Sequence, residues 1–80
     1  MKKQSANIPE PIAFDITTEF IKLDSLLKAV NIVGSGGEAK LLIATGEVEV
    51  NGEKELRRGR KLYPDDIVAV DEYRFIIKSS

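Results

Sequence analysis

The sequence predicts an α+β domain in which two short helices, packed as a helix-turn-helix-like pair, lie against a small, mostly antiparallel sheet of four to five strands. In two central stretches the apolar residues have the spacing of amphipathic helices, and in the stretches around them apolar and polar residues alternate as in half-buried strands. An Asn-Gly pair indicates a tight hairpin. With 80 residues, the chain has the length of one domain with a small core. We expect a disordered polar leader at residues 1–11 and a single domain at residues 12–80.

A strand and then a helix open the predicted domain. Residues 12–16, IAFDI, alternate with the period of two that is typical of a strand. In residues 22–31, KLDSLLKAVN, the three leucines and Val30 recur at i, i+3, i+4 and i+7, which predicts a helix with one buried face. Asp24 would lie in its first turn, where a negative charge suits the helix dipole. Residues 18–21 fit either an extra turn or a short extended segment.

A second helix is predicted at residues 36–45, GGEAKLLIAT. Ser35 followed three residues later by Glu38 is a capping-box pattern, in which the Ser side chain accepts from an unpaired amide of the first turn while the Glu side chain reaches back. Gly46 follows the last turn, where glycine readily takes the left-handed conformation that ends a helix. The short link between the two helices requires them to pack as a pair.

The stretch EVEVNGEKEL, from Glu47 to Leu56, predicts a hairpin. Residues 51–52 are Asn-Gly, the pair that favours a type I′ turn. A two-residue turn would place Val48 opposite Glu55, with a carboxylate on the apolar face. We therefore expect the return arm to be short, to bulge or to leave the sheet. Further on, Pro64-Asp65 predicts a turn, and residues 67–70 and 73–78 predict the last two strands.

The composition argues against a catalytic or membrane protein. The chain has no Cys and no His, which removes thiolate chemistry, the commonest general base and the commonest transition-metal ligand. None of its 13 carboxylates lies in an apolar run that would raise its pKa. No apolar stretch is long enough to span a membrane, and the N-terminus lacks the apolar part of a secretory signal. We expect a non-catalytic, cytoplasmic protein without cofactor or metal.

Cations gather in one place on an acidic background. Residues 54–61 hold five cations and one anion, a balance of +4, so that the other residues sum to -5 in a chain of net charge -1. Guanidinium groups match phosphate with a two-pronged fork, and Gly59 permits close approach of the backbone. These residues alone leave two alternatives, a phosphate or nucleic-acid contact and a plain solvated loop. Folding is expected to survive the replacement of Arg57 and Arg58 by Ala, because exposed cations contribute little to stability.

The order of motifs resembles the S4-type RNA-binding domain. That family combines a basic residue with Leu-Asp, a Ser-Arg step, an Ala-Lys or Ala-Arg pair, and a Gly-x-Val-x-Val-Asn-Gly hairpin. In this chain the matching residues are 22–24, Ser35, 39–40 and 46–52. The stretch RRGRKLY at 57–63 resembles a hallmark of its stand-alone bacterial members. The resemblance covers about residues 20–70. It departs at Gly36, where many members have Arg, and at Asp65, where Gly is frequent.

The resemblance implies an S4-like fold, the alpha-L motif, whose two helices and hairpin form one face for structured RNA, in particular ribosomal RNA. Ribosomal subunits or assembly factors are implied as partners of a monomeric chain. The implied RNA-binding residues are Lys22, Lys40, Asn51, Gly52, Arg57, Arg58, Arg60 and Lys61. Tyr63 fits either a base-stacking contact or the edge of the core.

An alternative function is that of a protein-binding adaptor. The acidic residues of the hairpin could form a docking surface for a basic partner, and the last strand could offer an edge to which a partner adds a strand. The acidic residues concerned are Glu47, Glu49, Glu53 and Glu55.

Overall fold

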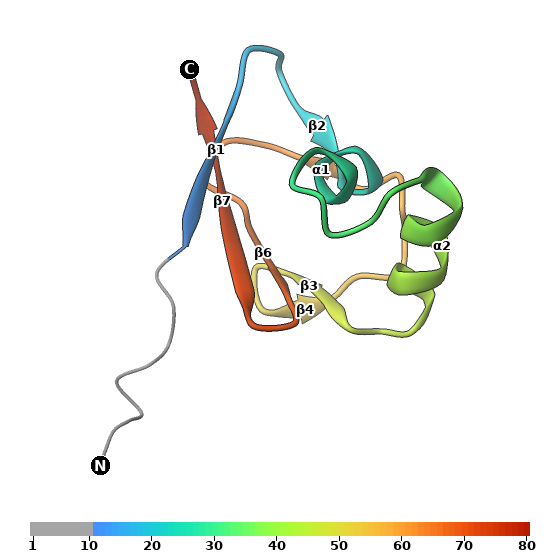
Figure 1. The fold of residues 1–80 in the computed structure, drawn as a ribbon. Coiled ribbons are helices and arrows are strands. Elements are labelled where there is room, and N and C mark those ends of the chain that lie inside the picture. The colour runs from blue at the N-terminus through green and yellow to red at the C-terminus, as the bar shows by residue number, and fades with distance from the viewer. Residues whose placement is uncertain (1–10) are drawn as a thin grey trace.

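The computed structural model describes residues 11–80, so all but Pro11 of the expected leader lies outside the described residues. The elements in chain order are β1 (Ile12–Ile16), β2 (Ile21–Lys22), α1 (Leu23–Ala29), α2 (Gly36–Ala44), β3 (Val48–Val50), β4 (Glu53–Lys54), β5 (Lys61–Leu62), β6 (Ile67–Val70) and β7 (Tyr73–Ser79). In Figure 1 both helices lie on the same side of β1 and β7. The predicted fold class, two helices packed on a small sheet, is confirmed.

The main sheet has five strands in the order β1-β7-β6-β3-β4. Its pairs are antiparallel except for β1 and β7, which run parallel with Ile12 opposite Phe75. A separate two-stranded ladder joins β2 to β5. Of the two alternatives for residues 18–21, the extended one is therefore correct for Ile21, because this segment finds a partner strand some 40 residues further along the chain.

The ends of α2 follow the sequence signals. The Ser35 hydroxyl accepts a hydrogen bond from the amide of Glu38 at 3.2 Å. The Glu38 carboxylate reaches back to the amide of Gly34, one residue before the cap, at 2.6 Å. Gly46 has φ +84°, in the left-handed region, and its amide donates to the carbonyl of Ile43. The predicted cap at the start and the predicted glycine stop at the end are both confirmed.

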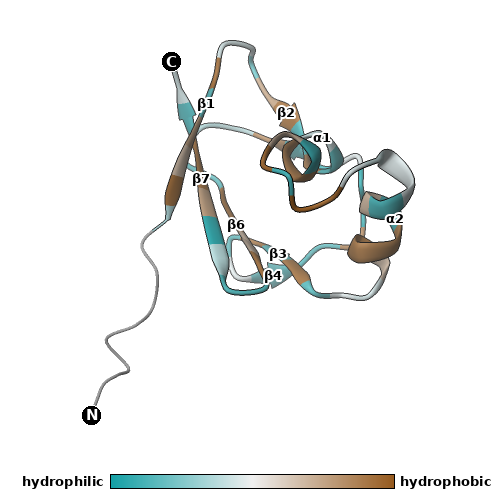
Figure 2. Cartoon of the chain, viewed as in Figure 1, coloured by the Kyte–Doolittle hydropathy of each residue, from teal (hydrophilic) through white to brown (hydrophobic). Residues whose placement is uncertain are grey.

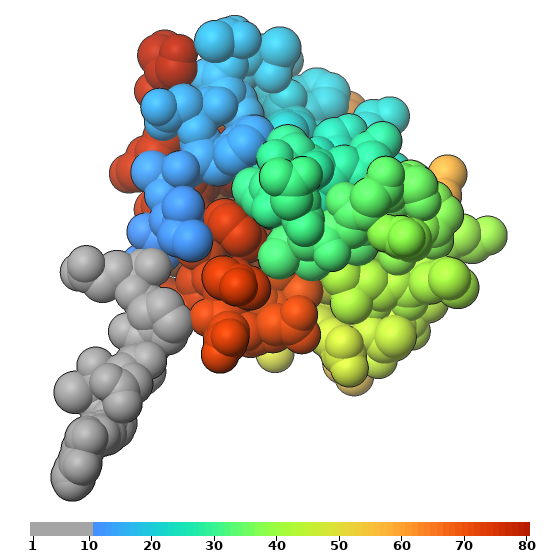
Figure 3. Space-filling model, viewed as in Figure 1, coloured from blue at the N-terminus to red at the C-terminus, as the bar shows by residue number. Residues whose placement is uncertain are grey.

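The core lies between the inner face of the sheet and the helices. Alternate residues of β3, β6 and β7 are buried, as the period of two requires. Apolar residues, brown in Figure 2, recur on β2, α1, the C-terminal part of α2 and β3, and the space-filling view in Figure 3 shows α1 and α2 side by side in green. The largest fully buried side chains are Leu23, Leu26, Leu27, Ile43, Leu62, Ile77, Val48, Val68 and Val70.

The hairpin has the predicted two-residue turn. Asn51 and Gly52 have φ values of 54° and 86°, and Val50 pairs with Glu53. The return strand β4 is only two residues long, as expected.

Glu55, which follows this short strand, is buried on the apolar face. Its amide donates to the carbonyl of Val48 at 2.9 Å, which continues the hairpin register by one more bond. Its side chain is only 6% exposed. The Glu55 carboxylate therefore stays on the buried face and must find its hydrogen-bond partners inside the fold.

Candidate nucleic-acid interface

The cationic stretch of the sequence forms the connection between β4 and β5 together with the first residue of β5, and we call residues 55–61 the basic loop. In Figure 1 it is drawn in light orange and rises from β4 towards α1. A tight turn shapes it, since the amide of Arg60 donates to the carbonyl of Arg57 at 3.2 Å. The loop is therefore ordered by its own backbone as well as by its neighbours.

The basic loop is attached to the start of α1 through its carbonyl groups. The amide of Leu23 donates to the carbonyl of Arg60 at 2.9 Å, and the amide of Asp24 donates to the carbonyl of Arg58 at 3.1 Å. The first amides of a helix have no partner within the helix, and Lys22, at the N-cap, offers no side-chain acceptor. The loop backbone thus caps α1, and in doing so it fixes where the cationic side chains emerge.

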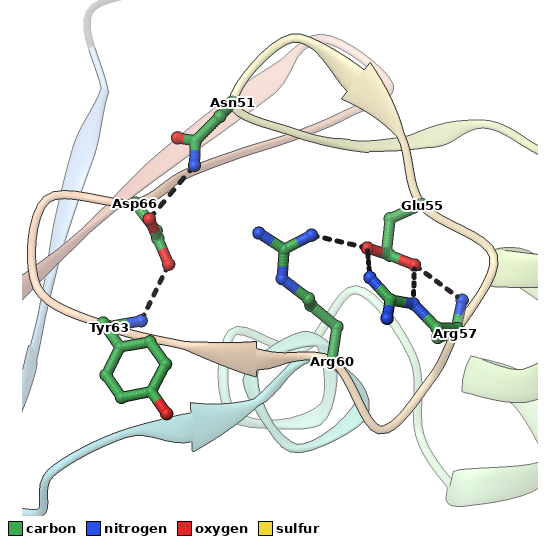
Figure 4. A network of polar contacts seen from close by, with 6 residues as sticks. All are labelled: Asn51, Glu55, Arg57, Arg60, Tyr63 and Asp66. Carbon is green, nitrogen blue, oxygen red and sulfur yellow. Dashed lines mark hydrogen bonds and ion pairs between the residues drawn. The ribbon is translucent and has the colours of Figure 1, made fainter.

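Glu55 is the internal counter-ion of two of the arginines (Figure 4). The guanidinium of Arg57 donates through Nε to Oε2 at 2.9 Å and through Nη2 to Oε1 at 3.0 Å, and its backbone amide adds a third bond to Oε2 at 3.0 Å. Arg60 donates through Nη1 to Oε1 at 2.7 Å. Arg57 and Arg60 therefore neutralise a buried carboxylate, a contact that the sequence did not predict for them.

These contacts change the acid–base properties of the pair. The hydrogen bonds from the Arg57 side chain outweigh the opposing effect of burial and lower the pKa of Glu55 from 4.5 to about 2. The same contacts raise the pKa of Arg57 above its ordinary value. The two arginines differ in exposure, because the Arg57 side chain is 73% exposed and that of Arg60 is 31% exposed.

Three other predicted binding residues meet at the edge of the same loop. Lys22 on β2 lies directly opposite Lys61 on β5. Arg58 is exposed, and within residues 11–80 its side chain has no ion pair. Like charges placed opposite each other on neighbouring strands repel, so an anion bound at this end of the ladder would relieve the repulsion.

An aromatic pair adjoins these cations. The rings of Phe20 and Tyr63 have their centroids 5.9 Å apart with a tilt of 53°, and the Lys61 ammonium lies 4.9 Å from the centroid of Phe20. Tyr63 is 43% exposed, and its amide donates to the Asp66 carboxylate at 2.8 Å. The ring of Tyr63 therefore belongs to the edge of the fold and is also open to solvent.

Asn51 has a structural task that the sequence did not reveal. Its Nδ2 donates to the carboxylate of Asp66 at 3.0 Å, and its Oδ1 accepts from the amide of Ile67 at 2.9 Å (Figure 4). The side chain thus ties the hairpin turn to the turn before β6, and both of its polar atoms are engaged. Gly52 beside it is exposed.

The second helix carries Lys40, which is exposed. Within the part of the chain that the structure describes, no hydrogen bond or ion pair joins it to the basic loop. Gly36, the first residue of α2, faces open space, since a Cβ added there would meet no heavy atom within 4 Å. The structure therefore brings Lys22 to the loop directly and leaves Lys40 on a separate element.

Comparison with known proteins identifies the family. A profile of the S4 domain family matches residues 14–78. The chain is also 44% identical over 63 residues to the probable ribosome maturation protein RlbA of Bacillus subtilis (strain 168), an alignment that covers 79% of this chain and 86% of that protein. The chain belongs to the S4 domain family.

The two departures noted in the sequence have simple structural consequences in this S4 domain. Asp65 has φ 79°, so that the residue in the place of a frequent Gly does adopt the left-handed region, which Asp tolerates better than most residues. Gly36 leaves empty the position from which an arginine would project at the start of α2.

Two supports of the adaptor alternative are removed by the structure of the S4 domain. The last strand β7 is paired on both sides, with β1 and with β6, so it offers no free edge. Glu55 is buried in contact with arginines rather than exposed to a partner.

Within residues 11–80, no helix is long and apolar enough to cross a membrane, and no group of three or more acidic, His or Cys side chains could hold a metal ion.

Proposed function

We propose that this S4 domain is a non-catalytic RNA-binding protein that holds structured ribosomal RNA during ribosome maturation in the cytoplasm. The observation that carries the proposal is the attachment of the basic loop to α1, which places Arg58 and Lys61 beside Lys22 in a chain whose net charge is -1. A local cationic surface on an acidic background attracts phosphate without turning the whole protein into an indiscriminate polyanion binder.

The chemistry of this surface suits the backbone of folded RNA. Proteins recognise double-stranded RNA mostly by shape, through contacts with phosphates and 2′-hydroxyl groups, because side chains cannot read its deep, narrow groove. Guanidinium and ammonium groups supply the phosphate contacts. The predicted binding residues that we assign to this surface are Lys22, Arg57, Arg58, Arg60 and Lys61, with Lys40 as a contact from the second helix.

The choice of ribosomal RNA rests on the relative. The Bacillus subtilis protein is named a probable ribosome maturation protein, and the alignment spans most of both chains. Because 44% of the aligned residues are identical and the alignment covers 79% of this chain, we extend that role to this protein and propose ribosomal subunits or their precursors as its partners.

The decisive experiment is crosslinking in cells followed by sequencing of the bound RNA. Enrichment of ribosomal RNA segments, reduced in an Arg58→Ala/Lys61→Ala variant, is the expected result. Recovery of no RNA above background would refute RNA binding. Recovery of other transcripts in place of ribosomal RNA would refute the ribosomal role.

Co-purification with and without nuclease separates this proposal from the adaptor alternative. Ribosomal proteins that reach this chain through RNA are expected to disappear after nuclease treatment. Partners that remain bound after complete digestion of the RNA would instead support direct protein docking.

A further inference from the structure

We propose that Glu55 is a positioning residue for RNA: it holds one edge of the Arg57 guanidinium so that the other edge faces outward, ready for a phosphate. The inference rests on the proposed RNA binding and adds to it a specific phosphate contact. It also gives a carboxylate inside a cationic loop a role that its charge alone would not suggest.

The geometry of the pair is the first support. Arg57 contacts Glu55 side-on, through Nε and Nη2, with distances of 2.9 and 3.0 Å. A side-on contact leaves the end of the guanidinium, Nη1 together with the second N–H of Nη2, pointing away from the carboxylate. Within residues 11–80 no acceptor is bonded to that end, and its two parallel N–H groups match two phosphate oxygens.

Exposure is the second support, because it separates Arg57 from Arg60. Arg60, 31% exposed, makes a single 2.7 Å contact to the Glu55 carboxylate. Arg57 is 73% exposed, yet it makes two side-chain bonds and one backbone bond to the same carboxylate. Glu55 itself is only 6% exposed, so the pair also serves the fold, but it holds at the protein surface a guanidinium that a ligand can reach.

Preorganisation is the physical gain. A free arginine side chain loses rotamer freedom when it is immobilised on a phosphate, and that loss weakens binding. Since Glu55 has already fixed Arg57 in the unbound protein, a phosphate that docks on the outer edge meets a side chain that needs no further ordering. The cost is the repulsion between the carboxylate and the phosphate, which the guanidinium between them screens.

Preorganisation and simple electrostatics predict opposite changes in RNA affinity when Glu55 is replaced by Gln. Glu55→Gln removes a negative charge from the loop, so electrostatics alone predicts tighter RNA binding. Positioning predicts weaker binding, by about tenfold for the loss of one charge-assisted two-pronged contact. Glu53→Gln is the matched control, because Glu53 is an exposed carboxylate two residues away whose removal changes only the charge. We expect it to leave affinity equal or slightly higher.

A double-mutant cycle shows whether Glu55 acts through Arg57. In an Arg57→Ala background, Glu55→Gln should no longer weaken binding to a ribosomal RNA fragment, because the side chain that Glu55 positions is gone. A loss of similar size in both backgrounds would mean that Glu55 only supports the loop as a whole, and would overturn the inference.

A further substitution keeps the inference open to refutation if Glu55→Gln fails to fold. Arg57→Lys keeps the charge and removes the fork, so it should weaken binding nearly as much as Arg57→Ala. Arg58→Lys is the comparison, and it should lose less, because no side chain within residues 11–80 orients Arg58. Full affinity in Arg57→Lys would show that Arg57 acts as a point charge and would overturn the inference.

The outcomes separate the inference from the proposed function. A wild-type protein that binds no structured RNA would refute the function and the inference together. A wild-type protein that binds RNA, with Glu55→Gln binding equally well or better, would refute the inference alone. Weaker binding in Glu55→Gln, absent from Glu53→Gln and lost in the Arg57→Ala background, would establish it.

Discussion

Lys22 and Lys61 lie directly opposite each other in the short β2–β5 ladder, although both carry a positive charge. Lys22 is also the N-cap residue of α1, where a cation is unfavourable to the helix dipole. The chain thus holds a cation where stability alone disfavours it. An arrangement of this kind is expected where binding rather than stability determines the residue.

Lys22→Gln should therefore move stability and binding in opposite directions. Removing the like-charge repulsion should stabilise the fold by about 0.2–1 kcal/mol at low salt. RNA affinity should fall, and the log-log slope of its salt dependence should become shallower by about 0.7–0.9 for the lost phosphate contact. Urea melts and RNA titrations at several salt concentrations measure the two effects. A variant that loses stability, or that binds RNA with the wild-type slope, would contradict the assignment.

The Gly52 position tests the hairpin turn. Gly52 has φ 86°, and an added Cβ would meet no heavy atom within 4 Å, so a substitution there is opposed by the backbone and not by crowding. Gly52→Val should lower the free energy of unfolding by about 1–2 kcal/mol. Gly52→Asn is the matched control, because Asn tolerates this region, and it should cost clearly less. Equal costs for the two variants in denaturant melts would show that positive φ is not the cause.

Glu55 should leave a signature in the pH dependence of stability. Its folded-state pKa of about 2 lies below the ordinary 4.5, so the ionised carboxylate stabilises the fold above about pH 5. This contribution should be lost as the pH falls from 4.5 towards 2, because protonation then favours the unfolded chain. Urea melts of wild type and Glu55→Gln should differ most near neutral pH and converge towards pH 2. A constant difference across that range would mean that the Glu55 charge is not what stabilises the loop.

Gly36 offers a gain-of-function test. Its position at the start of α2 is open, and other members of the S4 family often have Arg there. Gly36→Arg should fold, since Gly is a poor helix residue, and should tighten RNA binding while steepening the salt slope by about 0.7–0.9. Gly36→Ala separates the helix effect from the charge effect and should leave the slope unchanged. A Gly36→Arg protein with unaltered affinity and slope would place the start of α2 outside the RNA-binding surface.

The predictable parts of this protein are those that local sequence determines. The Ser35 cap, the Gly46 stop and the 51–52 turn each depend on residues within a few positions of one another, and the sequence predicted all three correctly. The β2–β5 ladder was not predicted as a pairing, because a two-residue strand carries no periodic signal and its partner is distant in the chain. The hydrogen bond from Asn51 to Asp66 was not predicted either, because the two residues are also distant in the chain.

The burial of Glu55 differs from these two cases, because the sequence did contain an indication of it. The hairpin register already placed Glu55 opposite Val48, on the apolar face. The sequence analysis considered only the course of the return arm and not that the neighbouring Arg57 and Arg60 could neutralise the carboxylate where it lies. A buried carboxylate followed at two and five residues by arginines is a pattern that sequence analysis can recognise as an internal ion pair.

Two arginines of the basic loop, Arg58 and Arg60, should show distinct roles when each is replaced by Ala. Arg60→Ala leaves the buried carboxylate without its 2.7 Å partner and should cost about 1–3 kcal/mol of stability. Arg58→Ala removes an exposed side chain that has no ion pair within residues 11–80, so its stability should stay within about 0.5 kcal/mol of wild type. Its RNA affinity should fall, with a slope shallower by about 0.7–0.9. Thermal and urea melts, run beside salt-dependent RNA titrations, measure both quantities for each variant. Equal stability losses for Arg58→Ala and Arg60→Ala would contradict the division, and an Arg58→Ala protein with wild-type affinity and slope would remove Arg58 from the RNA surface.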